Sequence, residues 1–109
     1  MLSEQTEIRT AKKRLPTFST EPALSEALSK IEATIESSEL TTRVELVKLT
    51  GFIQLVIWTL PDQVFELHQL LTHLTFEELG SPTIWSQRRD GMVIGDILDF
   101  PGQYIIYPV

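Results

Sequence analysis

Hydrophobic residues recur at helical intervals in two stretches of the chain, the first of them in its N-terminal third. Four large aliphatic side chains there are separated by four, three and four positions. They are Leu24, Leu28, Ile31 and Ile35. This spacing predicts a helix that is capped by Ser19 or Thr20, begins after that residue and buries one face. The same stripe would suit a helix pair between subunits, but it covers barely two heptads, so packing within the chain is favoured.

The second helical pattern follows Pro61 and Asp62, two residue types that suit a helix start. Its apolar arc consists of Val64, Leu67, Leu70, Leu71 and Leu74. A continuation through residues 75–79 reaches Gly80, which favours a helix C-terminus, and Pro82 prevents the helix from resuming. We therefore predict a helix over residues 62–79.

Residues 42–60, between the two helical patterns, allow two interpretations. Thr42 and Glu45 have the spacing of a capping box, which would begin a helix. Against this, the segment is dense in valine, isoleucine and threonine, whose branched side chains fit a pleated strand better. Thr50-Gly51 then marks a turn. Two strands are favoured over one helix.

The C-terminal third has the pattern of a strand meander. Two strand-like stretches over residues 83–88 and 92–98 flank Asp90-Gly91, a signal for a two-residue hairpin turn. Residues 99–102 contain Asp, Pro and Gly and turn the chain into a last strand over residues 103–107.

Taken together, the elements follow the order α-β-β-α-β-β-β. We predict one small α+β domain over residues 19–109, with a mainly antiparallel sheet of about five strands and two helices on one face. Residues 1–18 are polar and have no apolar period, so they are expected to form a flexible N-terminal arm.

The last strand is almost entirely apolar and must be covered. Its sequence is Gln-Tyr-Ile-Ile-Tyr-Pro-Val over residues 103–109. Either the protein's own sheet takes this strand in, or the strand lies at a sheet edge where another chain can pair with it.

Charge and composition narrow the class of partner. The chain of 109 residues carries a net charge of −6. Residues 1–14 contribute +2 and residues 15–109 contribute −8, so the acidic body repels a phosphate backbone and disfavours nucleic acid. There are no cysteines, no signal-like N-terminus and no apolar run long enough to span a bilayer. We expect a cytoplasmic protein with no membrane partner.

Motifs that carry chemistry are missing from the sequence. The five glycines are scattered rather than gathered in a phosphate-binding loop. His68 and His73 would point about 140° apart on a helix, which prevents both from holding one metal ion. Asp96 and Asp99 fit a strand position and a turn better than a pair of catalytic carboxylates. No catalytic residue, metal ligand or cofactor is therefore predicted.

Six residues near the C-terminus are the candidate partner-binding residues. Arg88 and Arg89 form the one basic pair in the acidic body and could hold a carboxylate or phosphate. The remaining candidates belong to nearby strands and include aromatic types that are common at interface hot spots: Trp85, Tyr104, Ile105 and Tyr107.

These features favour a non-enzymatic adaptor, a chaperone-like or assembly factor, that binds another protein through a sheet edge or an aromatic face. Self-association as a homodimer is left open. The alternative hypothesis is a winged-helix-like DNA-binding regulator, in which residues 75–91 supply a short helix, a turn and a recognition helix and residues 92–109 a wing. A small enzyme is the third hypothesis.

Overall fold

The computed structural model describes residues 17–40 and 43–109. The flexible arm predicted over residues 1–18 lies outside the described residues up to residue 16, and its mobility stays a prediction. Thr17 and Phe18 belong to the first helix, which therefore begins before Ser19 rather than after it.

Secondary structure follows the predicted order. The helices are α1 (Thr17–Glu36), the short 3-10 helix η1 (Pro61–Gln63) and α2 (Val64–Leu79). The strands are β1 (Arg43–Leu49), β2 (Phe52–Thr59), β3 (Thr83–Gln87), β4 (Val93–Ile97) and β5 (Gly102–Pro108). The ambiguous segment thus forms two strands, joined at Gly51, whose φ of 71° suits glycine. Thr42, the candidate cap of the alternative helix, lies outside the described residues.

Five strands form one mixed sheet in the order β1-β2-β5-β4-β3. Three of the neighbouring pairs are antiparallel, and β2 and β5 are parallel. The prediction of a mainly antiparallel sheet is confirmed, with this one parallel pair as the exception.

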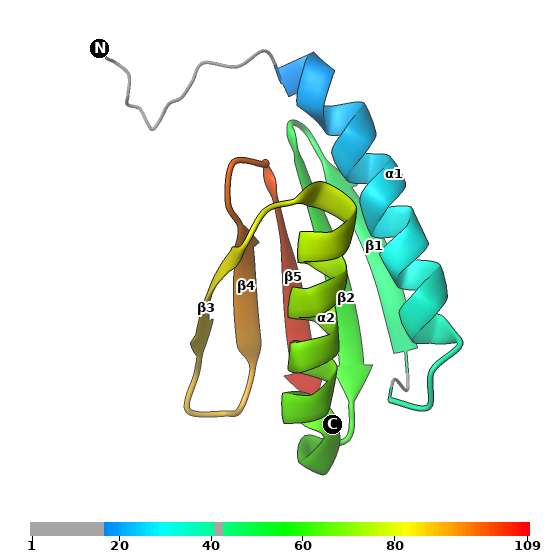
Figure 1. The fold of residues 1–109 in the computed structure, drawn as a ribbon. Coiled ribbons are helices and arrows are strands. Elements are labelled where there is room, and N and C mark those ends of the chain that lie inside the picture. The colour runs from blue at the N-terminus through cyan, green and yellow to red at the C-terminus, as the bar shows by residue number, and fades with distance from the viewer. Residues whose placement is uncertain (1–16, 41–42) are drawn as a thin grey trace.

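The terminal strand β5 is the central strand of the sheet, between β2 and β4 (Figure 1). The alternative that it lies at a sheet edge is therefore wrong. The physical reason is its composition, because a strand with neighbours on both sides and apolar contacts on both faces needs a nearly continuous apolar sequence. Over residues 103–106 the strand is paired on both sides, with β2 and with β4, so this part of its backbone is not available to another chain.

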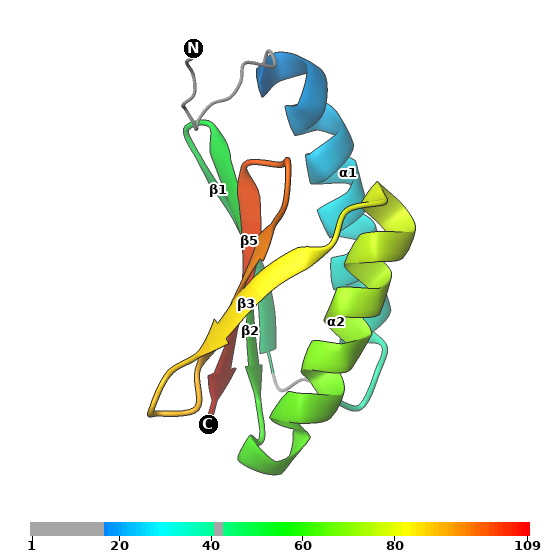
Figure 2. The same ribbon diagram turned by 60° about the vertical axis from the view of Figure 1, so that its left-hand side comes forward.

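Both helices cover the same face of the sheet, as predicted (Figures 1 and 2). The core lies between these two layers and includes the whole predicted stripe of α1. Its central members are Leu24, Leu28, Ile31, Ile35, Ile53, Leu55, Ile57, Leu67, Leu71 and Ile106. Packing of α1 within the chain is confirmed.

The connection between β3 and β4 is longer than the predicted two-residue turn. The strands end at Gln87 and begin again at Val93, and the Arg88 N–H donates to the Met92 carbonyl at 2.8 Å. Within this loop Gly91 has a φ of 92°, and an Asp90 carboxylate oxygen accepts a hydrogen bond from the Met92 N–H at 3.0 Å. The turn signal is correct in place, but a five-residue loop forms because the aspartate folds back on the backbone.

Candidate functional site: the β3 edge and its groove

The sheet has two outer strands, β1 and β3, and they differ in charge. β1 carries Arg43, Glu45 and Lys48, the kind of side chains with which proteins protect an edge from pairing. β3 has the sequence Thr-Ile-Trp-Ser-Gln and no charge. Ile84 is 62% exposed and Trp85 is 54% exposed. The edge at β3 therefore lacks the usual protection against another strand.

The backbone of β3 offers its outward hydrogen-bonding groups at alternate residues. The Arg88 N–H donates to Met92, and the Leu98 N–H donates to the Pro82 carbonyl at 3.0 Å. Since hydrogen-bonded pairs alternate in an antiparallel ladder, even-numbered residues of β3 face β4. The N–H and C=O groups of Thr83, Trp85 and Gln87 consequently point outward along the edge.

A groove runs between this edge and helix α2. One hollow of about 390 Å³ is lined by Phe65, His68, Gln69, Thr72, His73 and Trp85. A smaller hollow of about 190 Å³ shares three of these residues and is lined by Pro61, Val64, Phe65, His68, Trp85, Gln87 and Val93. Together the two hollows form what we call the Trp85 groove.

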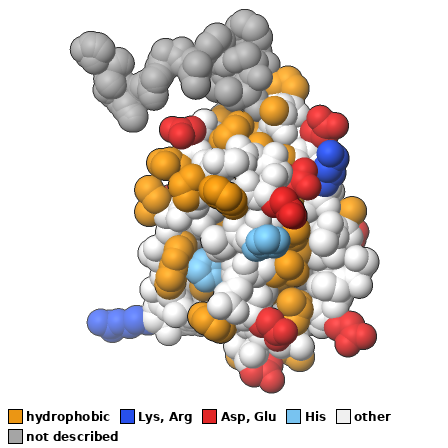
Figure 3. Space-filling view, in the orientation of Figure 1, with side chains coloured by type: hydrophobic (Ala, Val, Ile, Leu, Met, Phe, Trp, Pro, Cys, Tyr) orange, Lys and Arg blue, Asp and Glu red, His pale blue; other side chains and the backbone are white. Residues whose placement is uncertain are grey.

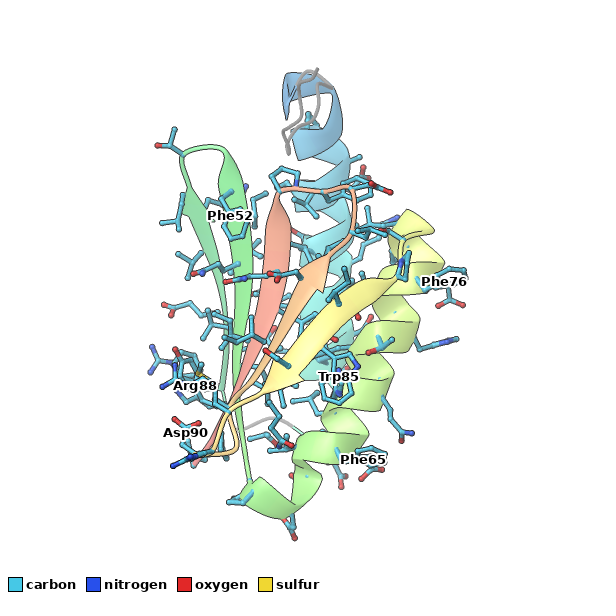
Figure 4. The ribbon with its side chains drawn as sticks, turned by 90° about the vertical axis from the view of Figure 1, so that its left-hand side faces the viewer. Phe52, Phe65, Phe76, Trp85, Arg88 and Asp90 are labelled. Carbon is cyan, nitrogen blue, oxygen red and sulfur yellow. The ribbon has the colours of Figure 1, made fainter. Side chains whose placement is uncertain are left out.

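Trp85 stands between β3 and α2, with Phe65 nearby on α2, in a view onto the β3 edge (Figure 4). Its ring contacts His68 edge to face, with ring centres 4.5 Å apart. Phe65 is 71% exposed. In Figure 3, the two histidine side chains have hydrophobic side chains around them on the helix-covered face. The groove therefore combines apolar and aromatic walls with an open strand edge.

His68 is buried under Trp85, with 7% of its surface exposed. Burial away from water lowers the pKa of this imidazole below its ordinary value of 6.5. Its Nε2 atom is enclosed and has no hydrogen-bond partner within the described part of the chain. The neutral ring consequently serves as an aromatic packing surface at neutral pH.

Tyr104 lies buried beneath the Trp85 groove, between α2 and β3. It is 1% exposed, and its hydroxyl lies 3.1 Å from Thr72 Oγ1 and 3.3 Å from Thr83 Oγ1. These contacts join α2 to the first residue of β3. Tyr104 therefore fixes the distance between helix and edge, and it is not accessible to a partner in this structure.

The predicted partner-binding residues divide among different places. Trp85 lies in the groove, and Arg88 and Arg89 are exposed in the loop after β3, where Arg88 Nη2 is 3.9 Å from an Asp90 carboxylate oxygen. Ile105 and Tyr107 lie on the opposite face of β5. The structure thus brings Trp85 and the two arginines to one edge, places Tyr104 buried beneath the groove, and separates all of these from Ile105 and Tyr107.

The face away from the helices has an aromatic cluster of its own. Tyr107 stacks on Trp58 with ring centres 5.7 Å apart. The Arg43 guanidinium lies 4.4 Å above the Trp58 ring, a cation–π contact. Ile105 is nearly buried by its neighbours. These side chains contact one another, and the outer strand beside them, β1, is the one that carries charged side chains.

Sequence reasoning missed Phe65 as a groove residue, although a signal was present. On the predicted helix, Phe65 falls on the polar side, far from the apolar arc that Val64 and Leu67 belong to. A large aromatic residue on the solvent-facing side of a helix can belong to a contiguous exposed apolar patch, the feature that indicates a binding surface. The same reasoning applies to Phe76, which is also exposed.

The helix required by the winged-helix alternative is not formed. Residues 83–87, the centre of the supposed recognition helix, form strand β3, because branched and aromatic residues such as Ile84 and Trp85 favour a strand. Among the described residues, no three His, Asp or Glu side chains are grouped to hold a metal ion. No helix in the described residues is both long enough and apolar enough to cross a bilayer.

Comparison with known proteins gives no relative: no family model, curated protein or solved structure matches the chain. The function is therefore inferred from the geometry of β3 and the Trp85 groove.

Proposed function

We propose that the protein is a non-enzymatic adaptor that binds another protein by adding an extended segment of it to the β3 edge. The observation that carries this proposal is the uncharged outer strand β3 with exposed Ile84 and Trp85 beside a groove. Strand addition of this kind obtains affinity from backbone hydrogen bonds and specificity from pockets for alternate side chains.

The geometry of the edge defines the chemistry of the segment. Outward groups at Thr83, Trp85 and Gln87 would pair with three alternate residues of a strand. Side chains of that strand alternate between two faces, so every second one would meet the Trp85 groove and the exposed ring of Phe65. We expect an extended, uncharged segment with large apolar or aromatic residues at alternate positions.

A matched pair of variants at Gln87 tests this proposal. Gln87→Pro removes an outward N–H and keeps the bonds to β4, since proline is tolerated on an edge strand whose N–H faces solvent. Gln87→Ala removes the same side chain, including its bond to the Gly91 carbonyl, and keeps the N–H. Both should fold, which circular dichroism checks.

A random peptide library displayed on phage supplies the probe. We expect selection on the wild-type protein to enrich peptides with alternating apolar residues. Synthetic versions should bind Gln87→Pro at least about tenfold more weakly than Gln87→Ala, by titration calorimetry, because a backbone hydrogen bond and steric access are lost. Enriched peptides that bind Gln87→Pro as tightly as wild type would contradict binding at this edge.

A further inference from the structure

We infer that β3 also pairs with β3 of a second copy, antiparallel about a two-fold axis at Trp85. In the absence of a client segment, each copy then occupies the β3 edge of the other. That this pairing regulates the binding of a client segment rests on the proposed function. The pairing itself is inferred from the symmetry of the β3 edge. Trp85 is the middle residue of the five-residue strand Thr83–Gln87.

The outward backbone groups of β3 are complementary to themselves. In antiparallel pairing centred on Trp85, each Thr83 lies opposite Gln87 of the second copy, and the two Trp85 residues face each other. These three positions are the ones whose N–H and C=O groups point outward. Each pair can exchange two backbone hydrogen bonds, so every outward group of both strands finds a partner.

The side chains at the axis also fit this arrangement. Both Trp85 rings lie on the helix-covered side, where hydrogen-bonded pairs place Cα atoms about 5.5 Å apart. The second Trp85 would cover exposed aromatic surface in the groove, including Phe65. On the other side of the sheet, exposed Ile84 would lie beside Ser86 of the second copy. A single contact would therefore bury the exposed apolar side chains at the β3 edges of both copies.

Charge at the two ends of β3 selects the antiparallel direction. Arg88 and Arg89 follow the strand. Pro82, just before the strand, is hydrogen-bonded to Leu98 and so lies next to the turn that contains Asp99. Antiparallel pairing brings Arg88 of one copy opposite Pro82 of the other, near that aspartate. Parallel pairing would instead bring the arginine pairs of the two copies together, which repels.

The contact is small, which makes the dimer reversible. A strand of five residues covers less than the roughly 800 Å² per partner of a standard stable interface. The pairing should therefore depend on protein concentration, and a client segment that fills the same edge should displace the second copy.

Sedimentation equilibrium of the full chain, wild type and both Gln87 variants, tests the pairing. We expect wild type to dimerise, and Gln87→Pro to dimerise at least about tenfold more weakly than Gln87→Ala, which lacks the same side chain but keeps the outward N–H. A wild-type chain that stays monomeric up to about millimolar concentration would overturn the inference, since weak contacts are populated there. Equal dimerisation of Gln87→Pro would also overturn it by placing the interface elsewhere.

Isotope-filtered NMR on a mixed labelled and unlabelled sample fixes the register. Residues beside a hydrogen-bonded pair form non-hydrogen-bonded pairs, whose Cα atoms approach to about 4.5 Å. We expect an intermolecular contact between the Hα of Ile84 and the Hα of Ser86 of the other copy. A dimer with intermolecular contacts at other residues and none at this pair would overturn the proposed register.

Competition separates this inference from the proposed function. Adding a peptide enriched by the wild-type protein should dissociate the dimer. If the peptide binds without dissociating it, closure of the partner site is wrong although the adaptor function stands. If no peptide is enriched while the Gln87-dependent dimer forms, the adaptor function fails and the self-pairing stands.

Discussion

Gly95 determines how the central strands fit beneath α2. It lies directly opposite Tyr104 in the register of β4 and β5. A Cβ atom at residue 95 would overlap the far end of the Tyr104 ring. The missing side chain of Gly95 thus makes the space through which Tyr104 reaches Thr72 and Thr83.

We expect Gly95→Ala to destabilise the protein by about 1 to 3 kcal/mol, because the ring must move and the core is overpacked. Denaturant midpoints measure this change. In a Tyr104→Leu background, which lacks the overlapping ring atoms, the same substitution should cost much less, as coupled neighbours are non-additive. Equal costs in the two backgrounds would show that the ring is not the obstacle.

Among the elements, α1 shows how a local pattern becomes a structural layer. Its four-residue stripe lies in the core, and Leu28 and Ile31 are each 1% exposed. The helix therefore contributes to monomer stability rather than to a helix pair between subunits.

Leu28→Ala or Ile31→Ala should lower the free energy of unfolding by about 2 to 5 kcal/mol, the range for emptying a buried site. Urea titration followed by circular dichroism measures this loss. Ser29→Ala, on the exposed side of the same helix, is the control and should change stability by less than about 0.5 kcal/mol. Losses as small as the control's at Leu28 and Ile31 would mean that the stripe is not part of the monomer core.

Strand β5 shows the limit of local reasoning at the same scale. Its apolar sequence indicates that the strand must be covered, but two different arrangements satisfy that requirement. Pairing with β2 decides between them, and this contact joins residues far apart in the chain, as the Gln54–Gln103 side-chain hydrogen bond of 2.7 Å across 49 positions shows.

For the whole molecule, burial of His68 couples stability to pH. Its pKa is lowered in the folded protein, so the unfolded chain takes up the proton more readily. The contribution of neutral His68 to the free energy of unfolding is fully present above the ordinary pKa of about 6.5, and it is lost as the pH falls below that value. Thermal unfolding between about pH 7.5 and 5 should show the decline.

The control is His68→Phe, which keeps an aromatic ring and cannot titrate. This variant should show a flatter pH profile over the same interval. Burial and then the nearby Glu36 raise the pKa of Glu32 above 4.5, so protonation of Glu32 at lower pH increases the free energy of unfolding. Glu32 is present in both proteins, so this contribution cancels when His68→Phe is compared with wild type. Identical profiles for His68→Phe and wild type would contradict the coupling.

Local sequence patterns are enough to specify the helices and strands and the buried face of each helix. The spacing of Leu24, Leu28, Ile31 and Ile35 sets one helix, branched residues set β1 and β2, and Gly80 ends α2 in a left-handed conformation, with its N–H bonded to the Phe76 carbonyl. These features depend on residues a few positions apart, so periodicity and turn chemistry record them.

The order of the strands, and with it the candidate site, depends on contacts between segments that are distant in the sequence. The parallel pairing of β2 and β5 places the terminal strand in the centre and leaves β3 at an edge. That order also brings Trp85 beside Phe65 and His68, and it separates Trp85 from Tyr107. The reason is physical: every strand carries the same backbone donors and acceptors, so its neighbour is chosen by burial of side chains across the whole domain rather than by its own sequence.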